Sequence, residues 1–175
     1  VKDFIDGKKI ILLDFPMGQV EREDYIKAAK IIDREILDGE CGALLTIGDS
    51  MTYSTFIYIM EELEKMNIDI EIVPGIPSYI AGAAKTKTPI TIKGDRFLLC
   101  DEFQEDLLDL VDSICVLKTL RNKEKILNSF EKKGFNYKYV KHCTLEDEEI
   151  LDNKDSILRD RDYMSFIVGR KKHES

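Results

Sequence analysis

The chain has 175 residues, of which 43% are hydrophobic, enough to bury a core in one domain or in two small ones. Its 34 acidic and 26 basic residues give a formal net charge of −8, which disfavours a protein that binds nucleic acid by neutralising phosphates. The sequence has no apolar run of about 18 residues and no signal-peptide pattern, so we expect a cytoplasmic protein that makes no use of a membrane.

The first half of the chain alternates between strand and helix patterns. Strands are predicted at residues 8–15, 41–47 and 68–73, and helices at 21–38, 53–66 and 78–85. The last of these helices is short and rich in Ala and Gly, and Ser78 is its expected N-cap. Strands that alternate with helices in this way favour a parallel sheet.

The pattern changes after Pro89. Strands are predicted at residues 91–92, 96–100, 113–118, 137–143, 148–151 and 163–170, and helices at 103–111 and 122–133. The last three strands follow one another with no helix expected between them, which favours a mixed sheet. We therefore predict a two-lobed α/β fold, with a parallel sheet in lobe 1–88, a mixed sheet in lobe 89–175, and a cofactor cleft between the lobes.

The cysteine and histidine pattern does not indicate a metal site. The four cysteines are far apart and form no C-x-x-C pair, so we expect them to be reduced and to behave as small hydrophobic residues. His142 adjoins Cys143, but neighbouring strand residues point to opposite faces of a sheet, and no other histidine lies nearby.

Two loops carry most of the functional information. The first, Gly48-Asp49-Ser50-Met51-Thr52-Tyr53-Ser54-Thr55, follows the predicted strand 41–47. The second, Val73-Pro74-Gly75-Ile76-Pro77-Ser78, closes the predicted strand 68–73. Each leads from a strand through a turn into a helix, so backbone N–H groups and hydroxyl side chains gather at the edge of the sheet where open α/β proteins bind ligands.

These loops resemble those of the tetrapyrrole methylases, in which a Gly-Asp-Pro turn and a Pro-Gly-(Ile/Val)-x-Ser turn hold S-adenosylmethionine. The residues Met51 and Tyr53-Ser54-Thr55, together with the upstream triplet Phe15-Pro16-Met17, are similar to the branch that methylates C-20 of precorrin-2 or its cobalt complex. The resemblance implies a methyltransferase of cobalamin and porphyrin biosynthesis that releases S-adenosylhomocysteine.

The resemblance also implies which residues bind the cofactor. The residues that match the family's contacts are Gly48, Asp49, Thr52, Tyr53, Ser54, Pro77, Ser78 and Leu117. The contact at the end of the strand 113–118 is made mainly by the backbone, at Leu117 or Lys118. A tetrapyrrole substrate and a homodimer are implied as well. The reaction chiefly requires alignment of carbon, methyl and sulfur with exclusion of water, and the sequence singles out no catalytic base.

The chain departs from the family pattern in two places. Ser50 stands where the family has proline, so its own hydrogen bonds must hold a turn that proline would preset. The opening strand and Gly-x-Gly-Pro-Gly-Asp turn of the family have no counterpart ahead of Lys8, so we expect the first lobe to lack that strand.

Two other functions stay open. One is a sibling methylase of the same family that acts on another tetrapyrrole. The other is a non-catalytic α/β module that binds a ligand, which Ser50 and the absent opening turn favour. A dinucleotide site is disfavoured because no G-x-G-x-x-G follows any predicted strand.

Overall fold

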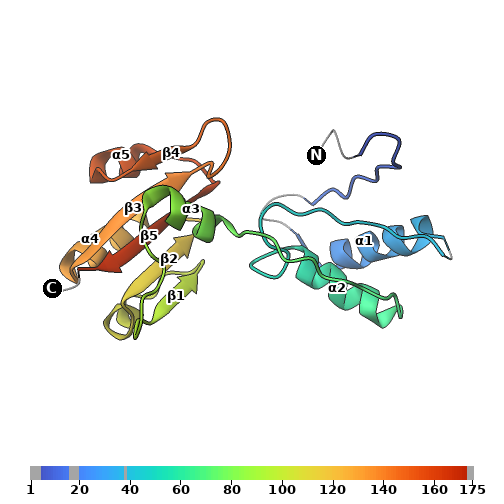
Figure 1. Ribbon diagram of the computed structural model, residues 1–175, viewed down its shortest axis with the longest axis horizontal. Coiled ribbons are helices and arrows are strands. Elements are labelled where there is room, and N and C mark those ends of the chain that lie inside the picture. The colour runs from blue at the N-terminus through green and yellow to red at the C-terminus, as the bar shows by residue number, and fades with distance from the viewer. Residues whose placement is uncertain (1–4, 16–19, 38, 173–175) are drawn as a thin grey trace. The chain divides into compact units, whose positions relative to one another are not determined.

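The computed structural model describes residues 5–15, 20–37 and 39–172. They gather into two compact units, Val1–Gly75 and Ile76–Ser175 (Figure 1). None of the helices in these described ranges combines the length and the apolar character needed to cross a bilayer.

The first unit is built on two helices, α1 (Arg22–Glu35) and α2 (Phe56–Lys65), which pack against each other. Helix α1 begins with a capping box, because the Asp24 carboxylate accepts a hydrogen bond from the Glu21 N–H at 3.0 Å. The buried residues between the two helices are Ala28, Ala29, Ile59 and Leu63. The small alanines let the helices approach closely.

The three segments expected to be strands in this unit do not form a ladder. They run beside the helices, but none of the backbone hydrogen bonds among the described residues joins one of these segments to another. Single side chains of these segments still pack on the helical core, as Leu13 and Leu44 do, whereas their neighbours Leu12 and Leu45 are exposed. The order of strands and helices led us to expect a parallel sheet, and the described residues of these three segments do not form its hydrogen-bonded pairing.

The second unit contains a five-stranded sheet in the order β1-β2-β5-β3-β4. The strands are β1 (Phe97–Cys100), β2 (Ser113–Leu117), β3 (Phe135–Lys141), β4 (Glu149–Leu151) and β5 (Ser165–Lys171). Strands β1 and β2 are parallel and the other pairs are antiparallel, with Leu117 of β2 opposite Phe166 of β5. The predicted mixed sheet is confirmed.

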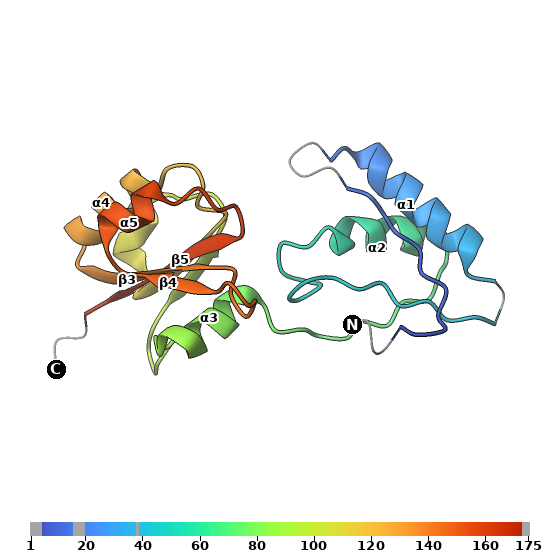
Figure 2. The same cartoon turned by 90° about the horizontal axis from the view of Figure 1, so that it is seen from above.

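Helices cover both faces of this sheet (Figure 2). Helix α3 (Ser78–Thr86) lies on one face, where Cys115, Val140 and Phe166 form a buried cluster. Helices α4 (Lys123–Lys132) and α5 (Lys154–Arg159) and the 3-10 helix η2 (Glu105–Leu110) lie on the other face, over the larger core. Alternate residues of each strand supply the two cores, as the pleat of a sheet requires.

Helix α3 is bound closely to the sheet. Gly82 lies so near Phe166 that an added Cβ would fall 2.3 Å from its ring, and Tyr79 stacks on Phe97 at a ring separation of 5.7 Å. This packing places α3 in the second unit, so the compact units divide at Gly75, whereas the sequence suggested a boundary near Pro89. The lobes 1–88 and 89–175 stay a prediction.

Three local features of the second unit differ from expectation. Residues 91–92 form no strand, and the helix expected at 103–111 is the shorter η2. Helix α5 lies between β4 and β5, where no helix was expected. It begins at an N-cap, Asn153, whose side chain accepts a hydrogen bond from the Ser156 N–H at 3.1 Å. With six residues, α5 is too short to show a helical period in the sequence.

Candidate functional site: two turns joined by a carboxylate

Asp49 joins the two loops that the sequence singled out. Its Oδ1 accepts hydrogen bonds from the Met51 N–H at 3.0 Å and from the Thr52 hydroxyl at 2.9 Å. Its Oδ2 accepts from the Gly75 N–H at 3.0 Å, across 26 residues of chain. The bond from Gly75, followed by those from Thr52 and Met51, lowers the pKa of Asp49 below its usual value. The carboxylate thus holds both turns in one arrangement.

The turns meet where neither has a side chain. A Cβ built on Gly75 would lie 2.1 Å from the carbonyl oxygen of Gly48 and 3.1 Å from the Cα of Asp49. Gly48 has a positive φ, 84°, which glycine tolerates, whereas Gly75 is needed for the close approach of the two backbones. Both glycines are exposed, so the joined turns present main chain to solvent.

The first loop continues into α2 by a tight bend. Tyr53 has a positive φ of 50°, which interrupts the helix expected from residue 53, so α2 begins at Phe56. The Ser54 hydroxyl then accepts a hydrogen bond from the Phe56 N–H at 3.2 Å, satisfying one free donor at the helix start. The side chains of Met51 and Tyr53 are exposed above the turn.

Ser50, which stands in place of the family's proline, is unusual among the described residues. Its hydroxyl oxygen is buried and has no hydrogen-bond partner within the described part of the chain. We expected Ser50 to be held by its own hydrogen bonds, and for its hydroxyl this was wrong, because the turn is held by the carboxylate of Asp49.

The remaining predicted contacts lie in the second unit. Pro77, with φ −69° and ψ 153°, is the N-cap of α3, and Ser78 is its first helical residue with no side-chain cap. The expectation that Ser78 is the N-cap was therefore wrong, because the extended backbone at Pro77 already ends the loop. The Pro77 carbonyl accepts from the Ile80 and Ala81 N–H groups.

Leu117 and Ser78 share one edge of the second unit. Leu117 is the last residue of β2 and packs on the cluster beneath α3, as does Cys143, which follows β3. The Cys143 thiol donates to the Ser78 carbonyl at 3.8 Å. The structure therefore gathers the predicted residues in two groups: Gly48, Asp49, Thr52, Tyr53 and Ser54 in the first unit, and Pro77, Ser78 and Leu117 in the second. The cleft between the lobes stays a prediction.

The upstream triplet is described only in part. Phe15 lies with its ring centroid 6.0 Å from that of Tyr25 and packs on the core of the first unit. Pro16 and Met17 lie outside the described residues.

Ionic groups that the sequence did not single out surround the same edge of the second unit. His142 contacts Asp147 through Nδ1 at 2.5 Å and Asp162 through Nε2 at 2.8 Å. The hydrogen bond to Asp147, opposed by partial desolvation and supported by Asp162, raises the pKa of His142. A carboxylate at each ring nitrogen favours the protonated imidazole, so His142 links the loops that carry Asp147 and Asp162.

Replacing His142 with glutamine should remove a pH-dependent part of the stability. Because the folded pKa is raised, the contribution of His142 is complete below its unfolded pKa of about 6.5 and is lost as pH rises through the folded value. Urea unfolding of both proteins from about pH 5 to about pH 9 measures this. The urea midpoints of the wild type and of His142→Gln should converge at alkaline pH. A difference between these midpoints that stays constant with pH would contradict the ionic role of His142.

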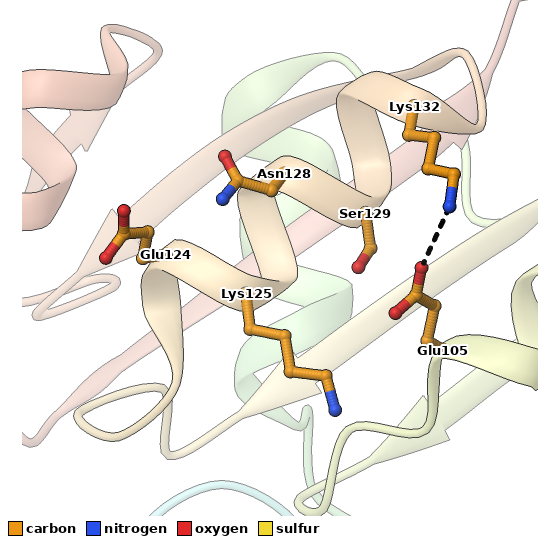
Figure 3. A pocket seen from close by; sticks show the side chains of 6 residues that line it. All are labelled: Glu105, Glu124, Lys125, Asn128, Ser129 and Lys132. Atoms are coloured by element: carbon orange, nitrogen blue, oxygen red, sulfur yellow. Dashed lines mark ion pairs between the residues drawn. The ribbon is translucent and has the colours of Figure 1, made fainter.

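A separate surface depression of about 400 Å³ lies between η2 and α4 (Figure 3). It is lined by Glu105, Glu124, Lys125, Asn128, Ser129 and Lys132. The Lys132 ammonium and the Glu105 carboxylate are 4.0 Å apart, so their charges face each other across it. None of the predicted site residues lines this depression, and it lies on the face of the sheet opposite to α3.

Comparison with known proteins extends the resemblance of the two loops to most of the chain. The protein is 35% identical, over 98% of its length and 76% of the relative's, to the probable cobalt-precorrin-2 C(20)-methyltransferase of Methanocaldococcus jannaschii. It is 29% identical over 53% of its length to the cobalt-precorrin-2 C(20)-methyltransferase of Salmonella typhimurium, covering 40% of that protein.

Solved structures agree in fold. The X-ray structure of a cobalamin biosynthetic enzyme, cobalt precorrin-4 methyltransferase, superposes with a TM-score of 0.72 at 21% identity, over 97% of this chain and 79% of that one. The uroporphyrin-III C-methyl transferase of Thermus thermophilus, complexed with S-adenosyl homocysteine, superposes with a TM-score of 0.52 at 18% identity. This match covers 69% of this chain and 62% of that one. These likenesses confirm the predicted α/β fold class.

The sequence profile of the Tetrapyrrole (Corrin/Porphyrin) Methylases matches residues 5–156, a span that includes both loops, the Asp49 link and four of the five strands. The chain therefore belongs to the tetrapyrrole methylase family.

Proposed function

We propose that the protein is an S-adenosylmethionine-dependent methyltransferase of cobalamin biosynthesis that methylates C-20 of precorrin-2 or of its cobalt complex. The observation that carries the proposal is the 35% identity, over nearly the whole chain, to a probable cobalt-precorrin-2 C(20)-methyltransferase. The residues Met51 and Tyr53-Ser54-Thr55, which favoured the C-20 branch, agree with it.

The joined turns fit a cofactor that is bound mainly by main-chain groups. Gly48 and Gly75 bring two backbones together without side chains, and Asp49 uses its carboxylate to hold them. We therefore assign the Asp49 side chain to organising the turns, and the backbone of Gly48, Asp49 and Thr52 to binding the cofactor.

On this proposal the chain promotes methyl transfer by positioning the reactants more than by supplying reactive side chains. S-adenosylmethionine, when bound, supplies a methyl group that its sulfonium has already activated. The main chain of the predicted contact residues would position this donor, and such positioning lowers the entropic part of the barrier. The structure of a related methyltransferase complexed with S-adenosyl homocysteine supports the choice of cofactor.

Titration calorimetry with S-adenosylhomocysteine tests the cofactor, with NAD and ATP as negative controls. The wild-type protein should bind S-adenosylhomocysteine alone, and Asp49→Ala should bind it at least about tenfold more weakly, because the turns lose the carboxylate that joins them. Asp69→Ala, at an exposed position of the same unit, is the matched control and should bind as the wild type does. Equal affinity of Asp49→Ala and wild type would reject the assignment of this loop.

Incubation with S-adenosylmethionine and precorrin-2, with and without cobalt, tests the substrate. Mass analysis should find one added methyl group on one of the two tetrapyrroles. Methylation of precorrin-4 or uroporphyrinogen in their place would identify a sibling activity, and binding of the cofactor without any transfer would favour a non-catalytic module. A homodimer and a cytoplasmic location are further parts of the proposal.

A further inference from the structure

The backbone turns sharply after the predicted cofactor contact at Leu117. Lys118 has a φ of 53°, in the left-handed region that residues other than glycine rarely adopt. Such a conformation persists only where its surroundings hold it. The contacts that hold this turn therefore act together with the pairing of Leu117 and Phe166 to position the end of β2.

Thr119 is the anchor on the far side of this turn. Its side chain is 1% exposed, and its hydroxyl lies 3.3 Å from the hydroxyl of Ser165, which is 6% exposed. Ser165 donates to the Asp162 carbonyl at 2.9 Å, so its proton is used and Thr119 is the donor of the pair. Thr119 and Ser165 thus tie the chain after β2 to the start of β5.

A buried ionic network holds Ser165 in turn. The Asp160 carboxylate accepts from the Tyr139 hydroxyl at 2.5 Å and from the Asp162 N–H at 2.8 Å. Lys123, only 5% exposed, donates to the Tyr139 hydroxyl and to the Asp160 carbonyl. Burial opposes the ionisation of Asp160, but these hydrogen bonds and those of Lys141 keep its pKa well below the usual range. The segment 160–165 is consequently a fixed base for the Thr119 contact.

We propose that Thr119 is a positioning residue for cofactor binding, which acts through its hydrogen bond to Ser165 to hold the backbone of Leu117 and Lys118. The assignment rests on the proposed function, since it takes the end of β2 as a cofactor contact. Neither Thr119 nor Ser165 belongs to the two loops that the sequence pattern identified, and the two residues are 46 positions apart.

The test compares three substitutions by calorimetry with S-adenosylhomocysteine and by thermal unfolding. Thr119→Val keeps the shape and removes the hydroxyl, and we expect about three- to tenfold weaker binding, the effect of one hydrogen bond. Thr119→Ser keeps the hydroxyl and should restore affinity to within about twofold of wild type. Ser129→Ala, at a buried hydroxyl on α4, is the control: it should leave affinity unchanged whatever it does to stability.

Ser165→Ala provides a second route if Thr119→Val does not fold, because it removes the same hydrogen bond from the other side. The double variant Thr119→Val with Ser165→Ala should bind S-adenosylhomocysteine as tightly as the single variant of lower affinity does. Both single variants lose the same hydrogen bond, so their effects should not add. A lower thermal midpoint with unchanged affinity in both single variants would overturn the assignment. Failure of the wild-type protein to bind S-adenosylhomocysteine would instead overturn the proposed function, and the assignment with it.

Discussion

Replacing Gly75 with alanine should both destabilise the first unit and abolish the binding of S-adenosylhomocysteine. The added Cβ would fall 2.1 Å from the Gly48 carbonyl oxygen and 2.9 Å from the Gly48 carbonyl carbon, and neither is the flexible end of a side chain. The backbones must separate, which breaks the hydrogen bond from the Gly75 N–H to Asp49. We expect a loss of about 3 kcal/mol in the free energy of unfolding, the upper range for overpacking.

Gly42→Ala is the matched control for this experiment. Its Cβ would also meet a close neighbour, but that neighbour is the end of the Ile36 side chain, which can rotate away. Urea unfolding and calorimetry on both variants give the comparison. Equal losses of stability, or normal cofactor affinity in Gly75→Ala, would show that the two turns are not held together as the structure indicates.

Replacing Asp160 with asparagine should cost about 3–5 kcal/mol of stability, because it leaves the buried Lys123 ammonium without its counter-charge. Lys123 also donates to the Tyr139 hydroxyl and to two carbonyl groups, but these neutral groups do not balance its charge. Chemical denaturation near neutral pH measures the loss. The sign of the pH effect is fixed: the pKa of Asp160 is lowered by folding, so its contribution is lost as pH falls.

Asp152→Asn is the control for the charge change itself. Asp152 contacts Lys138 at 2.7 Å, but this carboxylate is 70% exposed, so removing its charge should leave the unfolding midpoint nearly unchanged. If the Asp160 and Asp152 variants unfolded alike, the buried network would carry no more stability than a surface ion pair.

Local sequence patterns predicted the second unit well. The strands β2, β3 and β5 and helix α4 lie within a few residues of their expected bounds, because each has a run of apolar residues at the period of its own element. Strand pairing in the first unit could not be predicted in the same way. Alternation of Leu12 with Leu13 reports which side chains are buried, and it says nothing about whether a neighbouring backbone lies at hydrogen-bonding distance.

Those parts of the candidate site that lie in short sequence motifs could be predicted from the sequence. Gly48, Asp49 and Gly75 were identified from two short motifs, although the reason for Gly75 was a close approach that no motif encodes. The left-handed backbone at Tyr53, which residues other than glycine rarely adopt, and the N-cap at Pro77 were missed. Asp160 and Thr119 gave no signal, since their partners lie far away along the chain.

The bond between the Asp49 carboxylate and the Gly75 N–H also bears on how the first unit assembles. It closes a loop across 26 residues, and helix α2 occupies much of that loop. The entropy lost on closing a loop grows only slowly with its length, and a helix shortens the flexible part further. The two turns can therefore come together as soon as α2 forms, before distant parts of the chain have found their places. The segment 48–75 is thus a local module, in which the main chain of the two turns is shaped by contacts near in sequence.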